Sequence, residues 1–227
     1  MDDNGTKLAE LFRISKQSAR QTISFEYVPD KWRVITMATA GPYADERAEL
    51  LKTLDRYGIP WYTETVGPPC DWYEAVAMKA AWIAAKRREI HGPIVWLDAD
   101  ARVSSYPTLF SVLARAQVQF AAHWFRGSEL MTSVMYLGDT GTVQTVLDDW
   151  AVRCADSPRA FGTGDQKHLE AAITGDGISP FILPPEYCWI NGGRGDCDLS
   201  ARVYGTKRDP VIVQTQASRR FKKPGLR

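Results

Sequence analysis

Residues 94–100, Ile94-Val-Trp-Leu-Asp-Ala-Asp100, decide the fold class of this protein. Four consecutive apolar residues predict a short buried strand at 94–97. Two carboxylates, separated by one residue, follow the strand directly. Ligands of α/β sheets bind beyond the carboxyl ends of the strands, so Asp98 and Asp100 are expected where a ligand would lie.

The sequence on both sides of this stretch alternates between strand and helix patterns. Strands are predicted at 33–39, 59–66, 118–123, 133–137, 181–183 and 210–213, and helices at 44–57, 72–90, 109–116, 140–153 and 164–173. This alternation predicts an α/β sandwich of Rossmann type, with a mainly parallel central sheet and helices on both faces. Thr163 and Gln166 have the spacing of a capping box, with Thr163 as the N-cap. Residues 191–205 contain four glycines and are expected to form a mobile loop.

Length and composition indicate one globular domain. The chain has 227 residues, of which 44% are hydrophobic and 24% charged, values typical of a folded α/β protein. We expect an N-terminal extension at 1–30, the domain at 31–216 and a basic tail at 217–227. The net charge of +1 gives no overall attraction to nucleic acid or an anionic membrane. The tail is read either as a solvated terminus or as a phosphate-contacting segment.

The cysteines and the apolar runs indicate the compartment. Cys70, Cys154, Cys188 and Cys197 form no C-x-x-C pair, which argues against a zinc site and a dense disulfide framework. The N-terminus lacks a signal-peptide pattern, and no apolar run approaches the ~20 residues of a membrane span. These observations predict a cytoplasmic protein.

The pair Asp98 and Asp100 has the chemistry of a metal–diphosphate clamp. Mg²⁺ and Mn²⁺ prefer oxygen ligands, and Mg²⁺ takes one or two carboxylates while leaving positions for substrate phosphates. A second D-x-D pattern, at Asp196 and Asp198, lies in the glycine-rich segment without a strand before it. We read that second pattern as a surface turn.

Several further motifs occur in one order, and together with Asp98 and Asp100 they resemble GT-A-type glycosyltransferases over about residues 32–222. The resemblance is to small bacterial and phage nucleotide-diphospho-sugar transferases related to the glycogenin and galactosyltransferase group. The matching positions are Thr39-Ala40 with Tyr43, Lys79 in a long helix, residues 95–100, His123, Thr132-Ser133, Gly164-Asp-Gln166, residues 183–187 and residues 210–218.

The resemblance implies a role for each matching position. The donor nucleotide sugar would contact Thr39, Ala40, Tyr43, Lys79, Asp98, Asp100, Thr132 and Ser133. Lys79 would face the diphosphate, and Asp165 and Gln166 would lie beside the transferred sugar and its reacting carbon. Asp98 and Asp100 would bind Mn²⁺ or Mg²⁺. The family usually supplies a histidine near the chain end as a third metal ligand, where this sequence has Gln214 or Gln216.

The implied activity is transfer of a sugar from a nucleoside-diphosphate sugar, expected to be a UDP-sugar, to a hydroxyl acceptor. The sequence does not identify the acceptor molecule. The likeness to phage enzymes and the basic tail motivate one hypothesis, a modified base in phage DNA.

The sequence is also compatible with two other functions. Haloacid-dehalogenase-like phosphatases also place D-x-D after a strand, and Gly175-Asp176-Gly177 resembles their late acidic motif; however, Asp98 follows the third predicted strand rather than the first. A non-catalytic sugar-nucleotide-binding module is the third class, because a glutamine stands where the family has a metal-binding histidine.

Overall fold

The computed structural model describes residues 32–67, 72–157, 164–191 and 198–217. The predicted extension at 1–30 lies outside these ranges, as does the predicted tail except for Ala217. Thr163, Asp196, Cys70 and Cys197 lie outside them as well.

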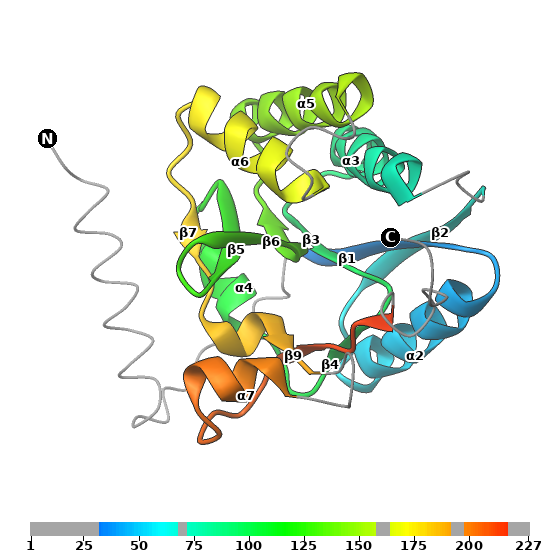
Figure 1. Ribbon diagram of the computed structural model, residues 1–227, viewed down its shortest axis with the longest axis vertical. Coiled ribbons are helices and arrows are strands. Elements are labelled where there is room, and N and C mark those ends of the chain that lie inside the picture. Colours follow the sequence, from blue (N-terminus) through cyan, green and yellow to red (C-terminus); the bar gives the residue numbers. More distant parts are fainter. Residues whose placement is uncertain (1–31, 68–71, 158–163, 192–197, 218–227) are drawn as a thin grey trace, which may run out of the picture.

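A six-stranded sheet with the strand order β2-β1-β3-β6-β5-β7 forms the centre of the molecule (Figure 1). Its strands are β1 (Arg33–Thr39), β2 (Trp61–Val66), β3 (Ile94–Leu97), β5 (Phe120–Phe125), β6 (Glu129–Leu137) and β7 (Phe181–Ile182). β1 pairs in parallel with β2 and β3, and β5 pairs in parallel with β7. β6 runs antiparallel to both β3 and β5. The predicted α/β class with a mainly parallel sheet is therefore confirmed.

β3 shows why the apolar run at 94–97 becomes a central strand. Successive side chains of a strand point to opposite faces, and here Ile94 and Trp96 enter one hydrophobic cluster while Val95 and Leu97 enter the other. All four side chains are buried. A strand covered on both faces needs a continuous apolar run rather than an alternating one.

Helices cover both faces of the sheet, as predicted (Figure 1). One face is covered by α3 (Trp72–Glu89), α5 (Gly141–Asp156) and α6 (Asp165–Gly175), and the other by α2 (Pro42–Arg56) and α4 (Thr108–Arg115). Ile83 of α3 packs with Trp150 of α5 in the first cluster, and Leu54 of α2 packs with Phe110 of α4 in the second.

A second, small sheet lies beside the carboxylate turn that follows β3. Its strand order is β4-β9-β8, with β4 (Ala101–Val103), β9 (Ile212–Gln214) and β8 (Trp189–Ile190), the last preceded by the 3₁₀ turn η1 (Pro185–Cys188). The prediction missed β4 and β8, although it placed strands at 181–183 and 210–213, close to the equally short β7 and β9. It also began β6 at 133, whereas the strand starts at Glu129.

The predicted loop at 191–205 is wrong for its second half. Residues Leu199–Tyr204 form α7, and Asp198 caps this helix by accepting a hydrogen bond from the Ala201 N–H at 2.7 Å. Asp198 also accepts one from Nε1 of Trp189 at 3.0 Å. The reading of Asp198 as a surface turn is corrected accordingly: its side chain joins α7 to β8.

Two observations bear on the expected compartment. Cys154 and Cys188 are buried free thiols. Within the described ranges, no helix combines the length and the apolar character needed to cross a bilayer.

Candidate functional site

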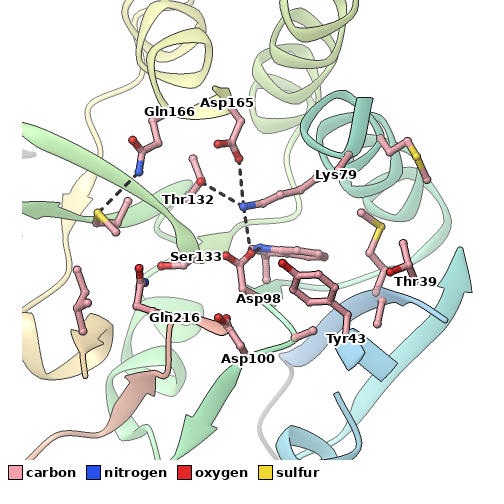
Figure 2. Close-up of a pocket in the computed structure, with 18 of the residues that line it drawn as sticks. Thr39, Tyr43, Lys79, Asp98, Asp100, Thr132, Ser133, Asp165, Gln166 and Gln216 are labelled. Carbon is pink, nitrogen blue, oxygen red and sulfur yellow. Dashed lines mark hydrogen bonds and ion pairs between the residues drawn. The ribbon is translucent and has the colours of Figure 1, made fainter. Parts of the chain in front are cut away.

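A cavity of about 470 Å³ opens at the carboxyl ends of β1 and β3 and brings together most of the predicted site residues (Figure 2). The predicted residues that line it are Thr39, Tyr43, Lys79, Asp98, Asp100, Thr132, Ser133, Asp165 and Gln166. They come from β1, α2, α3, the β3–β4 turn, β6 and α6, so only the tertiary fold places them together.

The turn Asp98–Ala101 holds both carboxylates of the D-x-D motif at the sheet edge. Its closing hydrogen bond runs from the Ala101 N–H to the Asp98 carbonyl at 2.9 Å, and the Asp98 N–H donates to the carbonyl of Ser133 on β6 at 3.0 Å. Nε1 of Trp96 donates to Oδ1 of Asp98 at 2.8 Å. These bonds fix the orientation of Asp98 before any ligand arrives.

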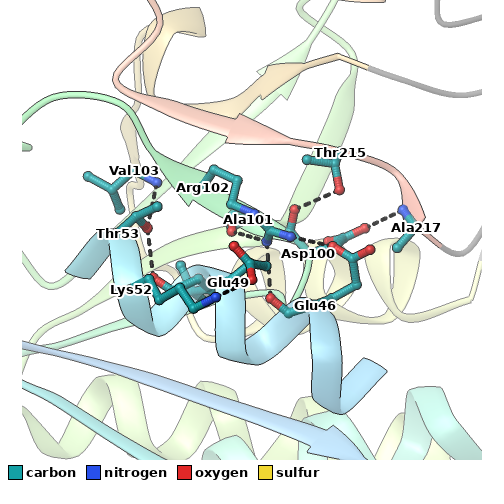
Figure 3. A network of polar contacts seen from close by, with 11 residues as sticks. Glu46, Glu49, Lys52, Thr53, Asp100, Ala101, Arg102, Val103, Thr215 and Ala217 are labelled. Atoms are coloured by element: carbon teal, nitrogen blue, oxygen red, sulfur yellow. Dashed lines mark hydrogen bonds and ion pairs between the residues drawn. The ribbon is translucent and has the colours of Figure 1, made fainter. Parts of the chain in front are cut away.

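Asp100 is clamped by the end of the chain's last described strand, β9. Both the N–H and the hydroxyl of Thr215 donate to the Asp100 carbonyl at 3.1 Å, and the Ala217 N–H donates to Oδ2 at 2.7 Å (Figure 3). Burial and then the nearby charge of Asp98 raise the pKa of Asp100 to about 6, against an opposing effect of the Ala217 N–H. A carboxylate whose ionised form is disfavoured in this way gains most from a bound cation.

Arg102 joins the same turn to α2. Its guanidinium pairs with the carboxylate of Glu46 and also donates to the Glu46 carbonyl at 3.1 Å (Figure 3). Thr53, farther along α2, accepts a hydrogen bond from the Val103 N–H at 3.1 Å. Because α2 also carries Tyr43 near its N-terminus, these bonds set the position of Tyr43 relative to the D-x-D turn.

The pKa of Tyr43 reflects the negative charge of the site. Burial, followed by the charges of Asp100, Asp98 and Glu46, raises the pKa of the Tyr43 phenol above its usual value. The phenol therefore stays protonated and can donate a hydrogen bond at neutral pH.

Lys79 sits between two of the acidic side chains of the cavity, Asp98 and Asp165 (Figure 2). Its Nζ lies 3.0 Å from Oδ1 of Asp98 and 3.1 Å from Oδ2 of Asp165, and it donates to Oγ1 of Thr132 at 3.2 Å. The ring of Trp96 lies below the ammonium, with its centroid 5.6 Å from Nζ. Burial alone would lower the pKa of Lys79, but the charges of Asp165 and Asp98 raise it above its ordinary value.

α6 begins at the site with Asp165 and Gln166. Its N-cap is Gly164, with φ +67°, one residue after the predicted N-cap Thr163, which lies outside the described residues. The positive φ suits a residue without Cβ and turns Asp165 toward Lys79. Nε1 of Trp150 donates to the Asp165 carbonyl at 3.0 Å, and Nε2 of Gln166 lies 3.8 Å from Sδ of Met131.

Two predicted site residues do not line the cavity. Ala40 is exposed beyond the end of β1. Gln214 is only 1% exposed and lies on β9 with its side chain on the same face as the core residue Ile212. Among the described residues, neither amide atom of Gln214 has a hydrogen-bond partner. Gln216 lines the cavity instead, because its φ of +56° breaks the alternation of β9.

The sequence interpretation missed other lining residues. Glu129, Met131, Met37, Met78, Trp96 and Phe125 also line the cavity. Glu129 and Met131 belong to the part of β6 that the prediction left outside the strand. Alternation carried back from Ser133 would have found Met131 and Glu129, since residues two apart share a face of a strand.

The donor atoms present fit a hard divalent cation that also binds a substrate. Asp98 and Asp100 offer carboxylate oxygens on one turn, and Gln216 offers an amide oxygen in the same cavity. Among the described residues there is no group of three or more His, Cys, Asp or Glu side chains that could hold a metal ion. Two carboxylates with remaining positions for phosphate and water are the pattern of Mg²⁺ at nucleotide sites.

A hydrogen-bonded pair supports the far wall of the cavity. Nδ1 of His123 lies 2.9 Å from the Leu183 carbonyl, and Nε2 lies 3.1 Å from the hydroxyl of Tyr204 on α7. A carbonyl only accepts, so Nδ1 carries the proton and Nε2 accepts from the Tyr204 O–H. The same hydroxyl accepts from the Arg126 N–H at 2.9 Å, which ties α7 to the β5–β6 hairpin.

Comparison with known proteins identifies the fold. No family model matches the sequence, and no curated protein matches it. Solved structures do match. A glycosyltransferase involved in the glycosylation of the major capsid of PBCV-1 has a TM-score of 0.61 and 15% identity over 82% of this chain and 96% of its own. The chain has a GT-A glycosyltransferase-like fold.

Two further structures share this GT-A-like fold. The glycosyltransferase GlyE of Streptococcus pneumoniae TIGR4 has a TM-score of 0.58 and 14% identity, covering 80% of this chain and 54% of GlyE. The galactosyltransferase LgtC, in complex with donor and acceptor sugar analogs, has a TM-score of 0.53 and 9% identity, covering 81% of this chain and 87% of LgtC. At these identities the GT-A-like fold is what is shared, and the chemistry must be argued from the residues.

Proposed function

We propose that this protein is a metal-dependent glycosyltransferase that moves a sugar from a nucleoside-diphosphate sugar, with a UDP-sugar as the expected donor, to a hydroxyl acceptor. The observation that carries the proposal is the bridge made by Lys79, whose ammonium contacts Asp98 of the D-x-D turn and Asp165 of α6 within one cavity. The solved structures that share the fold are glycosyltransferases, which supports the same reaction class.

The donor nucleotide would lie at the end of the cavity formed by β1 and α2. Thr39 and Tyr43 line this end together with the apolar side chains of Met37, Val66 and Met78. A base and ribose need apolar contact and a few hydrogen-bonding groups. Ala40 would contribute only through the backbone that continues from Thr39, since it does not line the cavity.

Asp98 and Asp100 would hold the Mn²⁺ or Mg²⁺ ion, and the third ligand would be the amide oxygen of Gln216, because Gln216 lines the cavity and the other sequence candidate, Gln214, does not. Such an ion, when bound, stabilises the charge of a departing diphosphate and orients it. Asp98 already has its carboxylate fixed by Trp96 and Lys79. Asp100 has a pKa raised to about 6, so it is mostly ionised at neutral pH and gains from cation binding.

Lys79, Thr132, Asp165 and Gln166 would act on the transferred sugar and diphosphate. The ammonium of Lys79 supplies a fixed positive charge where negative charge grows as the sugar–phosphate bond breaks. The carboxylate of Asp165, 3.1 Å from that ammonium, would face the carbon that becomes positively charged. Because Lys79 pairs with both carboxylates in the free protein, its position is set before the donor binds.

The test is nucleoside diphosphate release from a panel of sugar nucleotides. The full chain is mixed with each donor and Mn²⁺, Mg²⁺ or a chelator, and release is followed by chromatography. We expect slow metal-dependent release from one donor, abolished in Asp100→Ala and retained in Asp149→Ala, whose carboxylate pairs with Arg153 on α5. Release of phosphate from simple phosphoesters without any sugar-nucleotide turnover would instead support a phosphatase. Donor binding without turnover would support a binding module.

A further inference from the structure

The cavity has a second end beyond the D-x-D turn, and β6 leads to it. Ser133 accepts the hydrogen bond from the Asp98 N–H, Thr132 accepts from Lys79, and Met131 contacts Gln166. Glu129, the first residue of β6, also lines the cavity. Glu129 lies four positions before Ser133 along the strand, at most about 13 Å at about 3.3 Å per residue. Glu129 thus lies along β6 from the turn of Asp98, and among the described residues no group of three or more acidic, histidine or cysteine side chains could hold a metal ion.

Apolar side chains line the cavity near Glu129. Phe125 pairs with Glu129 across the β5–β6 hairpin, and Leu199 of α7 lines the same cavity. The hairpin turns through Arg126 and Gly127, with φ of +55° and +75°, and closes with the Ser128 N–H donating to the Phe125 carbonyl at 3.2 Å. The paired residues Phe125 and Glu129 are thus joined by a short connection of three residues.

The charges of the cavity disfavour an anionic acceptor. Its acidic lining residues are Asp98, Asp100, Glu129 and Asp165, and Lys79 is the only lysine or arginine among the described lining residues. Lys79 is already paired with two carboxylates. An acceptor that carries phosphate or carboxylate groups would meet repulsion from Glu129, and the described lining residues supply no lysine or arginine other than Lys79 to offset it.

We infer that this end binds an uncharged sugar as the acceptor, with the Glu129 carboxylate accepting a hydrogen bond from one of its hydroxyls. A sugar ring offers a C–H face for the apolar wall of Phe125, Met131 and Leu199, and hydroxyls for a carboxylate and for the amide of Gln166. Glu129 is exposed and forms no ion pair within the described ranges, so its acceptor atoms are available.

This inference rests on the proposed glycosyl transfer. In that reaction an acceptor hydroxyl oxygen forms a bond to the anomeric carbon. The bond from that carbon to the diphosphate breaks, its electron pair leaves on the nucleoside diphosphate, and the hydroxyl proton passes to the buffer. Glu129 acts on the acceptor alone, because it lies away from Asp98 and Lys79, and transfer of the donor sugar to water does not require it.

The test separates acceptor use from donor turnover. With the donor found above, nucleoside diphosphate release by the full chain is measured without an acceptor, with methyl glycosides of neutral hexoses and pentoses, with glucuronides, and with duplex DNA containing hydroxymethylated bases. We expect a neutral glycoside to accelerate release. Glu129→Gln replaces the charged acceptor by a weaker, neutral amide oxygen, which should raise the KM for that glycoside about fivefold or more, with acceptor-free release within about twofold of the wild type.

Glu49→Gln is the matched control, because Glu49 is exposed on α2, pairs with Lys52 and does not line the cavity. Acceleration by glucuronides or DNA alone, or an unchanged KM in Glu129→Gln, would overturn the inference while leaving the transferase proposal intact. An absence of donor turnover with every sugar nucleotide would overturn both. Saturation-transfer NMR with the neutral glycosides, nucleoside diphosphate and Mg²⁺ gives a binding readout that is independent of turnover.

Discussion

Lys79 and Asp165 come from different helices, α3 and α6, and Nζ of Lys79 lies 3.1 Å from Oδ2 of Asp165. The two side chains are only 13% and 10% exposed. A buried ion pair costs desolvation energy, and its geometry repays that cost only when further groups satisfy the charges. Here Asp98 and Thr132 provide those contacts to Lys79, so the pair couples the D-x-D turn to the start of α6.

The Lys79–Asp165 pair predicts a strong double-mutant coupling in the metal-free protein. Lys79→Met removes the cation between Asp98 and Asp165 and should lower the free energy of unfolding by about 2–4 kcal/mol. Asp165→Asn leaves Lys79 paired with Asp98 and should cost less. In the double variant the two losses should not add, with a coupling of about 1–3 kcal/mol. Urea denaturation of the four proteins measures it, and additive losses would refute the coupling.

Asp100→Asn should stabilise the metal-free protein while abolishing metal-dependent turnover. The pKa of Asp100 is raised from 3.8 to about 6 in the folded state, so ionisation costs folding free energy above pH 6 and nothing below about pH 4. We expect the free energy of unfolding of Asp100→Asn to exceed that of the wild type by about 1–2 kcal/mol at pH 7.5. This difference should shrink as the pH falls to 5. Denaturation at both pH values checks it; a variant less stable than the wild type at pH 7.5 would contradict it.

Protonation of His123 should lower the free energy of unfolding in mild acid. Burial lowers the pKa of His123, and the Leu183 carbonyl and the charge of Glu186 offset this only partly. A histidine with a lowered folded pKa contributes stability that is complete above its ordinary value of 6.5 and is lost as the pH falls through the folded pKa. Between pH 7.5 and pH 5.5, the free energy of unfolding of His123→Asn should fall by about 1 kcal/mol less than that of the wild type.

His91→Asn serves as the control for this measurement, since His91 is exposed at the end of α3. Its stability should follow the wild-type pH dependence. An unchanged pH dependence in His123→Asn would show that the hydrogen bonds to Leu183 and Tyr204 do not fix the neutral imidazole.

Gly138 should tolerate no side chain, for steric rather than torsional reasons. A Cβ at this position would lie 2.6 Å from the Val118 carbonyl oxygen and 3.0 Å from that of Gln119. Both contacts are backbone atoms, which cannot rotate away. Gly138→Ala should therefore lower the free energy of unfolding by about 1–3 kcal/mol. Gly141→Ala, at the start of α5 with nothing within 4 Å of its Cβ, is the matched control and should be neutral or stabilising. Equal effects at the two positions would refute this reading.

Most of the fold and the centre of the site could be predicted from local patterns. The apolar run at 94–97 required a strand buried on both faces, and Asp98 and Asp100 followed it at the edge where ligands bind. The periods of 2 and 3.6 located the long elements. The prediction failed for α7 because glycines at 192–195 concealed a six-residue helix, and for β4 because Ala101-Arg-Val103 offers no apolar run.

The sequence by itself determined the α/β class, the D-x-D turn and the residue types that would form a donor site. The tertiary structure decided which of them meet. It brought Lys79 between Asp98 and Asp165, turned Gln216 rather than Gln214 into the cavity, and placed Glu129 at its far end. Strand and helix periods are local and can be read along the chain, whereas these contacts join segments far apart in sequence and depend on how the packed elements are oriented.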